Sequence, residues 1–397
     1  MNLLKVRNCG DYKYKIKLWG LYEKAKIFHL VTVSKSIPLM KGQIEFLRGK
    51  GLDACIISSD GKEIRKFDKD AYRIVNMERE ISILKDIKSL VNLIILFLKE
   101  KPLIVNSGTP KAGLLGTIAA FITKRPNRIY TVRGLRLETV TGLRYKLLYT
   151  MEKIAMMCST DIIAISDSLK EKIIELGLAK ESKIRILGYG SSNGLNVKDF
   201  NVTNNKIDIN IKEQLVNSFV VGYVGRIVKD KGISELIKSF QKLQELKYNI
   251  KLLIVGDFEK ADSISDEEIK ILKNDSNIVW VNRVDNPVAY FNNMDVFVFP
   301  TYREGFGNVS IEAQLLKVPV ITTNVTGAKD TVINGETGFI VEKNEVDAIV
   351  EKIELLINDE NYRKNLGENG KKWIEKYFSN DIIWNDLEQL YINLLQK

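Results

Sequence analysis

Short apolar runs alternate with longer amphipathic stretches from about residue 26 onward. The runs "KIFHLVTV", "DACIIS", "PLIVNS", "NRIYTV" and "DIIAIS" are rich in β-branched residues. Between them lie segments with helical periodicity, such as "IPLMKGQIEFLRGKG". Strands that alternate with helices are typical of βαβ units around a parallel sheet. The first half of the chain is therefore predicted to be an α/β domain.

A second series of the same kind begins near residue 217. It contains the apolar runs "SFVVGYVG", "NIKLLIVG", "NIVWVN", "DVFVFP" and "VPVITT", with helical stretches such as "ISELIKSFQKLQEL" between them. Because each series repeats the strand-helix alternation, the pattern predicts two Rossmann-like, doubly wound parallel-sheet domains.

The region 190–216 interrupts this alternation. It is rich in Asn, Gly and Ser, as interdomain linkers often are, so the boundary is placed near residue 200. We expect an N-terminal domain over 1–200, a C-terminal domain over 201–380, and a final helix over 381–397 that packs back on the first domain. The apolar face of that helix comprises Ile382, Ile383, Leu387, Leu390, Tyr391 and Leu394.

The length and the cysteine and histidine content narrow the class of protein. A chain of 397 residues is longer than one ordinary core accommodates, which agrees with two domains. Its cysteines (Cys9, Cys55, Cys158) and its single histidine (His29) are too few and too scattered for a disulfide framework or a zinc site. We therefore expect no metal and a reducing compartment.

Two segments bear on location. The N-terminal "MNLLKVRNCGDYKYKIKLWG" has no continuous apolar region and no small-residue cleavage site, so it does not resemble a secretory signal. The longest apolar run, "LVNLIILFL" at 90–98, is too short to span a bilayer and is predicted to be a buried helix. The protein is expected in the cytoplasm.

The net charge of +10 is unevenly distributed. Lys and Arg outnumber Asp and Glu in residues 1–200, the reverse holds in 201–397, and the basic excess is concentrated in 101–160. Such a surface can attract a phosphate-bearing partner or an anionic membrane leaflet. It can also be a merely solvated basic surface.

A loop with two glycines and two carboxylates follows the run "DVFVFP". In "REGFGNVSIEAQ", Gly305 and Gly307 permit a close backbone approach, and the N–H groups of a helix beginning near Asn308 can bind phosphate or sugar oxygens. Glu304 and Glu312 would then contact two parts of one elongated ligand. Alternatively, Glu304 only favours the start of the helix and Glu312 is a surface residue.

A second candidate lies in "GYVGRIVKDKGI", where a strand ends in glycine and a helix follows. Arg226 and Lys231 flank this loop, and two cations together with loop N–H groups suit a diphosphate. The alternative is a pair of solvated cations.

These motifs resemble a known family. "GRIVKDKG", then "PTYREGFGNVSIEA", then "VPVITTNVTGAKDTVINGETGFIV" are similar in order and spacing to the C-terminal domain of the family 4 retaining glycosyltransferases, whose GT-B fold has two Rossmann-like domains facing across a cleft. Upstream, "TPKAGLLG", "RIYTVRGLRLET", "AISDSLKE" and "ILGYGSSNGLN" resemble bacterial members that build capsule, exopolysaccharide or O-antigen units on polyprenyl diphosphate.

The resemblance implies a role for the four charged residues. Arg226 and Lys231 would bind the donor diphosphate and offset the charge of the departing nucleotide. Glu304 would contact the donor sugar, and Glu312 would bind the ribose hydroxyls. The donor is a nucleoside-diphosphate sugar, with UDP as the default nucleotide.

The resemblance also implies that backbone groups hold the donor. Arg283 and Val284, after the strand "IVWVN", occupy the place where this family meets the base. The N–H groups of Phe306 to Val309 would hold sugar hydroxyls and phosphate oxygens. The donor-binding loop thus comprises Gly305, Phe306, Gly307, Asn308 and Val309.

In this family the anomeric configuration is retained without a well-placed protein nucleophile, which agrees with a sequence that has one histidine and no evident catalytic triad. One position departs from the family pattern: where many relatives carry a histidine before "TPKAG", this chain has Gly108. Asn106 or Ser107 are candidate substitutes, whereas His29 lies inside a predicted strand and is interpreted as a packing residue.

Acceptor binding is assigned to the basic first domain. Lys111, Arg133 and Arg136 are the candidates for a lipid diphosphate or its sugar, although each can instead be a structural or surface cation. The segment 143–157, "LRYKLLYTMEKIAMM", mixes apolar and basic residues, as a peripheral helix on the inner face of the cell membrane would. A buried amphipathic helix has the same composition.

Other functions remain open at this point. A nucleotide-sugar 2-epimerase or a phosphorylase-like enzyme would share the GT-B fold, but an epimerase needs acid/base groups on both sides of the sugar. A nucleic-acid-binding protein would suit the pI of about 9.1, but aromatic residues are not interleaved with the basic cluster, and we expect no nucleic acid. A dinucleotide dehydrogenase is disfavoured because no Gly-x-Gly-x-x-Gly follows the first strand.

Overall fold

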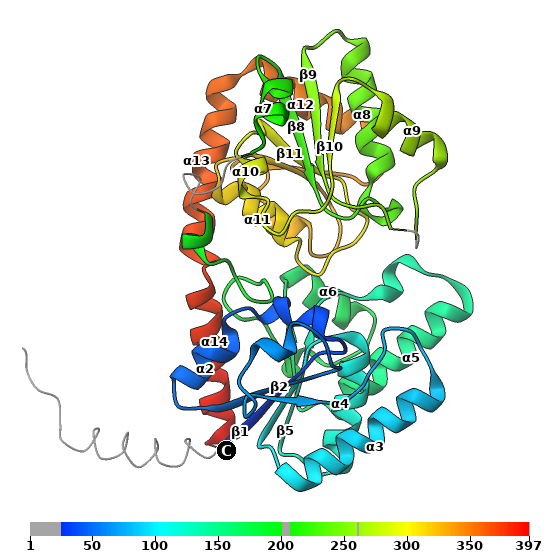
Figure 1. Ribbon diagram of the computed structural model, residues 1–397, viewed down its shortest axis with the longest axis vertical. Coiled ribbons are helices and arrows are strands. Elements are labelled where there is room, and N and C mark those ends of the chain that lie inside the picture. Colours follow the sequence, from blue (N-terminus) through cyan, green and yellow to red (C-terminus); the bar gives the residue numbers. More distant parts are fainter. Residues whose placement is uncertain (1–24, 201–206, 260–261, 397) are drawn as a thin grey trace, which may run out of the picture.

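The computed structural model describes residues 25–200, 207–259 and 262–396. Two lobes are stacked along the long axis of the molecule, and each is built on one parallel sheet (Figure 1). Residues 1–20, which were predicted not to form a secretory signal, lie outside the described residues. The boundary predicted near residue 200 falls beside 201–206, which are also outside them.

The first lobe contains a seven-stranded parallel sheet in the order β3-β2-β1-β4-β5-β6-β7. Its strands are β1 (Lys26–Leu30), β2 (Asp53–Ser58), β3 (Tyr72–Ile74), β4 (Ile104–Ser107), β5 (Asn127–Val132), β6 (Asp161–Ala164) and β7 (Ile184–Arg185).

The second lobe contains a six-stranded parallel sheet in the order β10-β9-β8-β11-β12-β13. Its strands are β8 (Phe219–Val224), β9 (Ile250–Val255), β10 (Ile278–Val281), β11 (Val296–Phe299), β12 (Val320–Thr323) and β13 (Gly338–Val341). The predicted α/β class with two doubly wound sheets is confirmed.

In each sheet the chain order reverses once, beside the first strand of that sheet. The reversal lies between β1 and β4 in the first lobe and between β8 and β11 in the second. Loops leaving the two strands at such a point turn to opposite faces, so a crevice opens at their carboxyl ends. The carboxyl ends of both sheets face the boundary between the lobes, since the loops after β5 and β11 meet there.

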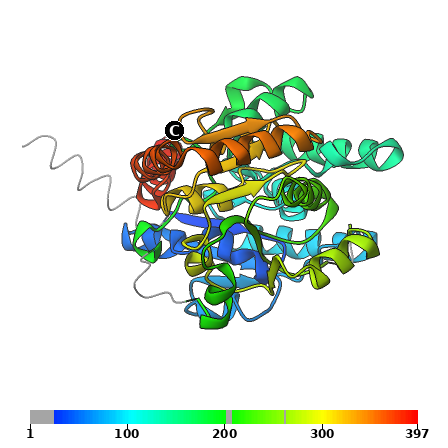
Figure 2. The same cartoon turned by 90° about the horizontal axis from the view of Figure 1, so that it is seen from above.

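The helices of the first lobe cover both faces of its sheet (Figures 1 and 2). Three of them connect β3 to β4, β4 to β5 and β5 to β6, and these connections all run in the same direction across the sheet. Because such crossovers are right-handed, the three helices lie on the same face. They are α3 (Ile83–Glu100), α4 (Pro110–Ile122) and α5 (Gly142–Cys158). α6 (Asp167–Glu175) follows them, whereas α2 (Gln43–Gly49) lies on the opposite face.

The second lobe encloses one apolar core between its sheet and its helices. Its helices are α7 (Ile209–Leu215), α8 (Ile233–Glu245), α9 (Asp266–Asn274), α10 (Val288–Phe291), α11 (Asn308–Leu315), α12 (Val346–Asn358) and α13 (Glu360–Tyr377). α8 is a clear amphipathic case, since Leu236, Phe240 and Leu243 are fully buried at helical spacing.

The last helix, α14 (Asn380–Leu395), returns to the first lobe. Its apolar face, including Ile383, Leu387 and Tyr391, lies in one buried cluster with Ile27 of β1 and Ile44 of α2. α13 and α14 follow each other along one side of the molecule and link the two lobes (Figure 1).

The chain passes between the lobes at two places that touch each other. Leu195, before the second lobe, donates its N–H to Phe378 O at 2.8 Å and accepts from Asn380 N at 2.9 Å. The approach is so close that a Cβ on Gly194 would lie 2.8 Å from Asn380 Cα. The two connections thus form one hydrogen-bonded crossing.

The apolar run at 90–98 is not the buried helix that its composition predicts. In α3 Leu93 and Phe97 are fully buried, but Val91, Ile95 and Leu98 are 47%, 58% and 55% exposed. The reason is that α3 lies in the outer helical layer, where the sheet covers only one of its sides. Within the described ranges no helix combines the length and apolarity needed to cross a bilayer.

Candidate active site

A pocket of about 270 Å³ opens at the carboxyl ends of β8, β9 and β10. It brings together three residues that the sequence assigned to the donor: Arg226, Arg283 and Val284. Its other lining residues are Val224, Gly225, Val255, Gly256, Asp257, Glu259 and Pro287. Charged and apolar side chains therefore line one pocket, as a nucleotide requires.

The floor of this pocket is backbone. Gly225 and Gly256 end adjacent strands, and a Cβ on Gly256 would lie only 1.8 Å from Gly225 O. Trp280 fixes this strand end, since its indole Nε1 donates to Gly256 O at 2.9 Å. Only glycine allows the two chains to approach so closely, so a ligand in the pocket can rest directly on the strand ends.

Two acidic residues in the pocket were missed in the sequence. Glu259 Oε2 lies 2.9 Å from Arg226 Nη1, and both side chains are about half exposed. Asp257 accepts a hydrogen bond from Arg283 N at 2.9 Å. The available signal was the strand "LIVGD", which repeats the strand-then-glycine pattern of "GYVGR".

A buried ion pair stands at the reversal point of the second sheet. Lys231 Nζ donates to Glu304 Oε1, and the two side chains are only 11% and 18% exposed. Gly232 follows with φ +70°, and a Cβ there would lie 2.0 Å from Pro300 O. The turn after Lys231 therefore depends on glycine, and it holds the lysine against the loop that carries Glu304.

The loop 304–308 touches the first lobe directly. A Cβ on Gly305 would lie 2.4 Å from Arg133 O, and one on Gly134 would lie 3.3 Å from Gly305 Cα. Gly134 has φ +112°, a conformation that favours glycine. The two lobes therefore meet at the backbone of this loop, and any side chain added there would separate them.

Phe306 is an anchor as well as a possible backbone donor. Its side chain is 2% exposed and belongs to an apolar cluster that joins first-lobe residues to α11 and α13, with its ring centroid 5.4 Å from that of Phe378. The sequence assigned only its N–H group. The sequence did not predict this packing, because the side chain of Phe306 is buried only through contact with residues of the other lobe.

α11 begins directly after this loop. Gly307 precedes the helix with φ +79° and offers no side-chain cap, so the first N–H groups of α11 have no intrahelical acceptor. Asn308 Oδ1 accepts from Ser191 Oγ of the first lobe at 3.1 Å. Val309 follows in the first turn. The role of these N–H groups in donor binding stays a prediction.

Glu312 lies farther along α11 and does not line the pocket of Arg226. Its side chain is partly exposed, and burial raises the pKa of the carboxyl from 4.5 to about 7. In the part of the chain that the structure describes it has no hydrogen-bond or ion-pair partner. Such a carboxyl is a suitable acceptor for two hydroxyl groups.

Arg133 fills the space left by Gly108. A Cβ on Gly108 would lie 1.9 Å from Arg133 Nη1, and this nitrogen donates to Gly108 O. Arg133 Nε also donates to Ser192 Oγ at 2.6 Å, and burial lowers the arginine pKa to about 10. Where relatives place a histidine, this chain therefore presents a guanidinium without a carboxylate partner among the described residues.

The cavity beside Arg133 is small, with a volume of about 10 Å³. Asn106 lines it but is occupied, since its Nδ2 donates to Tyr391 Oη at 2.8 Å and its Oδ1 accepts from Thr131 Oγ1 at 2.7 Å. His29 is buried 3.0 Å from the same hydroxyl, and burial lowers its pKa to about 3, as suits a neutral packing residue. Ser107 Oγ is buried and has no hydrogen-bond partner among the residues that the structure describes.

The other two acceptor candidates are not in this cavity. Lys111 is 7% exposed; its Nζ lies 2.7 Å from Asp86 Oδ1 and also donates to Glu80 O. This geometry favours a structural cation that joins the starts of α3 and α4. Arg136 is exposed on the short helix after Leu135, at the border between the lobes.

Several interdomain contacts had no signal in the sequence. Asp330 of the second lobe accepts from Ser168 N at 3.1 Å and from Ser168 Oγ, at the start of α6. Thr326 Oγ1 donates to Glu138 Oε2 at 2.6 Å, and burial raises the pKa of Glu138. These contacts hold the lobes together beside the loop 304–308.

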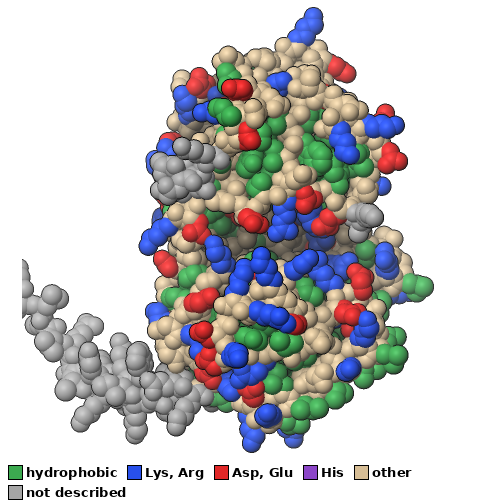
Figure 3. All heavy atoms as spheres, viewed as in Figure 1, with side chains coloured by type: hydrophobic (Ala, Val, Ile, Leu, Met, Phe, Trp, Pro, Cys, Tyr) green, Lys and Arg blue, Asp and Glu red, His purple; other side chains and the backbone are tan. Residues whose placement is uncertain are grey.

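Figure 3 shows the boundary between the lobes as a band where basic side chains gather, above all on the side of the first lobe. Across the described residues, no three His, Cys, Asp or Glu side chains come close enough together to hold a metal ion.

Family models match both lobes. The model described as "Glycosyl transferases group 1" matches residues 205–373, and "Glycosyl transferase 4-like" matches 26–166. The chain is 61% identical over 372 residues to the capsular polysaccharide biosynthesis glycosyltransferase CapM of Staphylococcus aureus, covering 94% of this chain and 98% of that protein.

A more distant relative is the UDP-Gal:alpha-D-GlcNAc-diphosphoundecaprenol alpha-1,3-galactosyltransferase of Escherichia coli, 27% identical over 394 residues, covering 94% of this chain and 98% of that protein. Among solved structures, a glycosyltransferase from Rickettsia africae has a TM-score of 0.75 at 21% identity and covers 95% of this chain and 100% of that one. Anabaena HepE in complex with UDP has a TM-score of 0.74 at 18% identity, covering 92% and 99%. The likeness to these two structures shows the fold. The sequence matches confirm the family that the motifs predicted, and the chain belongs to the family 4 glycosyltransferases of GT-B fold.

Proposed function

We propose that this glycosyltransferase is a retaining, metal-independent hexosyltransferase of capsule, exopolysaccharide or O-antigen synthesis. It moves a sugar from a nucleoside-diphosphate sugar, by default a UDP-sugar, to a polyprenyl-diphosphate-linked sugar at the inner face of the cell membrane. The name of the Staphylococcus aureus relative supports the pathway, and the name of the Escherichia coli relative supports the lipid-linked acceptor. The UDP complex of the Anabaena neighbour supports the nucleotide.

The proposal depends most on the pocket that collects Arg226, Arg283 and Val284 next to the Lys231–Glu304 pair. The nucleotide occupies the pocket, and its diphosphate lies toward Arg226 and Lys231. As the bond to the sugar breaks, negative charge grows on the diphosphate, and these two cations stabilise it. No metal is required for that charge compensation.

The remaining roles follow from position. Glu304 is held by Lys231 at the meeting point of the lobes, where the donor sugar must lie if the diphosphate is at Lys231. Glu312 accepts hydrogen bonds from the ribose. Arg133, the uncompensated guanidinium of the first lobe, is the favoured residue for an acceptor phosphate, with Arg136 beside it.

The decisive experiment is calorimetric binding of UDP-, GDP- and dTDP-sugars to the wild-type chain and to Arg226→Ala. The matched control is Lys229→Ala, since Lys229 is an exposed cation on the same loop without an ion-pair partner in the described structure. We expect one nucleotide to bind, Arg226→Ala to weaken it about 10- to 100-fold, and the control to leave it unchanged. Turnover of Arg226→Ala should fall about 100- to 1000-fold. Equal affinities for the three proteins would contradict the assignment.

A nucleotide-sugar 2-epimerase is the alternative within the same fold. Conversion of the donor in the absence of any acceptor would favour it. Transfer of labelled sugar into an organic-soluble lipid fraction would favour the transferase. Salt-sensitive binding of RNA or DNA without nucleotide-sugar binding would contradict both.

A further inference from the structure

Helix α3 is apolar on two opposite sides. One side carries Leu93 and Phe97, both fully buried against the sheet. The other presents Leu84, Ile87, Val91, Ile95 and Leu98, which are 82%, 54%, 47%, 58% and 55% exposed. Their spacing of three or four residues forms a continuous stripe along the helix, about 21 Å long at 1.5 Å per residue. A helix with apolar residues all round is normally enclosed on all sides, whereas here only one side is covered.

The neighbouring helices extend this stripe. α3, α4 and α5 lie on the same face of the first sheet (Figures 1 and 2). On α5, Leu143, Leu147 and Met157 are 84%, 50% and 65% exposed, and at the end of α4 Phe121 and Ile122 are 56% and 53% exposed. We call these residues, together with the α3 stripe, the outer apolar face. In Figure 3 hydrophobic side chains reach the right and lower edges of the first lobe.

The charge on this layer is one-sided. All acidic residues between 83 and 158 are occupied: Asp86 by Lys111, Glu100 by Lys26 and Arg73, Glu138 by Thr326, and Glu152 by Tyr130. Seven exposed cations of the same segment have no ion-pair partner within the described residues. They are Lys88, Lys99, Lys101, Lys124, Arg136, Arg144 and Lys146. The outer apolar face is therefore surrounded by uncompensated positive charge.

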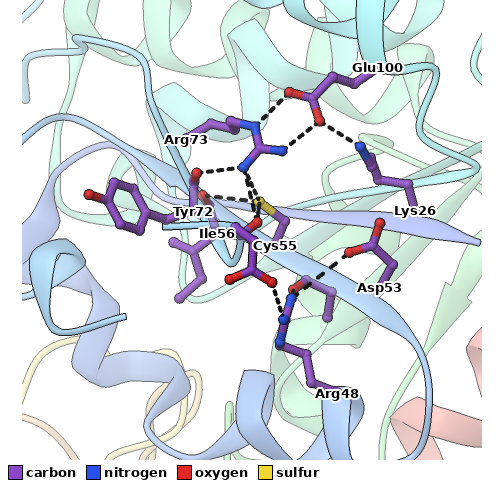
Figure 4. Close-up of polar contacts among 10 residues, drawn as sticks. Lys26, Arg48, Asp53, Cys55, Ile56, Tyr72, Arg73 and Glu100 are labelled. Atoms are coloured by element: carbon purple, nitrogen blue, oxygen red, sulfur yellow. Dashed lines mark hydrogen bonds and ion pairs between the residues drawn. The ribbon is translucent and has the colours of Figure 1, made fainter. Parts of the chain in front are cut away.

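α3 is held rigidly at both ends. Near its start, Asp86 pairs with Lys111 at 2.7 Å. At its end, Glu100 Oε2 lies 2.7 Å from Lys26 Nζ and Glu100 Oε1 lies 2.6 Å from Arg73 Nε, so one carboxylate ties the helix to β1 and β3 (Figure 4). The stripe is thus presented in one fixed orientation, and no large ordering cost accompanies its use in binding.

The direction of the helices relates this face to the cleft. Helices in βαβ units begin at the carboxyl ends of the preceding strands, which is the side of the sheet that faces the second lobe. The exposed Leu84 and Leu143, at the first turns of α3 and α5, therefore lie toward the cleft, and Leu98 and Met157 lie far from it. The outer apolar face begins at the cleft and extends away from it.

We propose that the outer apolar face docks on an anionic lipid bilayer. Exposed aliphatic side chains enter the interface between headgroups and acyl chains, and the surrounding lysines and arginines pair with lipid phosphates. Apolar anchors combined with uncompensated cations match an anionic bilayer, whereas a basic surface without the apolar stripe would suit only a soluble polyanion. This inference rests on the proposed function in one respect: a lipid-linked acceptor would reach the cleft along the same surface.

Vesicle cosedimentation tests the proposal. Full-length protein is mixed with vesicles of phosphatidylcholine alone or of phosphatidylcholine with phosphatidylglycerol, at low and high salt. We expect binding only to the anionic vesicles. It should weaken when salt is raised from about 0.1 M to about 1 M, because the Debye length falls from about 10 Å to about 3 Å.

Two triple variants separate the apolar contribution from a general effect of mutation. Leu84→Gln/Val91→Gln/Ile95→Gln should lower vesicle binding at least about tenfold, since each side chain loses its apolar burial. The control Val216→Gln/Leu246→Gln/Leu355→Gln removes three residues of the second lobe that are 55%, 55% and 39% exposed, and it should bind like the wild type. Thermal unfolding at an unchanged temperature verifies that each variant is folded.

The outcomes that overturn the proposal are specific. The first is no binding of the wild type to anionic vesicles at low salt, and the second is equal binding of the two triple variants. The third is a wild-type dimer in ultracentrifugation that is absent in the α3 triple variant, with vesicle binding at background. The last result would make the face a contact between two copies of the chain. Vesicle binding needs no sugar nucleotide, so its failure is distinguishable from failure of the calorimetric donor screen.

Discussion

Glu312→Gln should make the protein more stable and less able to bind its donor. The folded chain holds the pKa of this carboxyl at about 7, because burial disfavours the charged form, whereas the unfolded value is 4.5. At about 1.4 kcal/mol per pKa unit, the difference amounts to roughly 3 kcal/mol. Part of the side chain is exposed, so we expect about 1–3 kcal/mol.

The sign of the pH dependence follows from the raised pKa. Below pH 4.5 the carboxyl is protonated in both states and imposes no penalty. Between 4.5 and about 7 the unfolded chain loses the proton and the folded chain keeps it, so wild-type stability falls as pH rises. Above that window the full penalty is present, and glutamine removes it.

The assay is thermal unfolding of wild type and Glu312→Gln across the window. At a few degrees per kcal/mol for a domain of this size, the variant should melt about 2–10 °C higher at pH 8 and no higher near pH 4.5. Glu336→Gln, an exposed carboxyl of the same lobe, is the control and should show no such trend. A melting difference that is constant with pH, or shared by the control, would refute the reasoning.

The same variant tests the ribose assignment. A neutral amide is a weaker acceptor than a carboxylate, so nucleotide affinity should fall about tenfold or more in Glu312→Gln. If hydroxyl groups bind the charged form, donor binding near pH 6.5 should also release protons, which calorimetry in two buffers of different ionisation enthalpy measures. Unchanged affinity and no proton release would remove Glu312 from the donor site.

Three further outcomes are expected. Gly134→Ala adds a Cβ about 3.3 Å from Gly305 Cα at φ +112°, so turnover should fall at least about tenfold. Nucleotide affinity measured by calorimetry is a property of the second lobe and should be retained. Loss of affinity would contradict this. Asp330→Asn weakens charge-assisted hydrogen bonds to Ser168, so differential scanning fluorimetry should show a melting temperature lower by a few degrees, and an unchanged value would show that this contact does not hold the lobes together. Excess EDTA should leave turnover within about twofold, because cations compensate the leaving diphosphate; activity restored only by added Mg²⁺ or Mn²⁺ would overturn metal independence.

The sequence was most informative where strands end. Ligands bind at the carboxyl ends of parallel strands, so "GYVGR" predicted Arg226 at a binding site, and the family resemblance added Arg283 and Val284; all three line one pocket. The family and the fold are confirmed. They could be predicted because glycines and charged residues at strand ends recur at fixed spacing. The catalytic and binding roles of these residues remain predictions that the donor screen tests.

The sequence was least informative where a contact joins distant segments. Local composition did not reveal that Lys111 is paired with Asp86 of the preceding helix, or that Arg133 fills the space above Gly108. Periodicity found the apolar residues of α3, but it gave no indication of which side the sheet would cover. In each case the deciding neighbour lies on another element, and only the three-dimensional packing identifies it.

The paired connections at Leu195 and Asn380 determine how the enzyme can open. Because both links between the lobes run through one hydrogen-bonded point, a rotation that opened the lobes would pivot there. Atoms farther from the pivot would move farther in such a rotation. A small rotation would therefore separate Gly134 from Gly305, while α13 and α14 would stay linked at the pivot. A cut in either link would leave the other as a tether, and cleaved protein should stay associated but lose the geometry of closure.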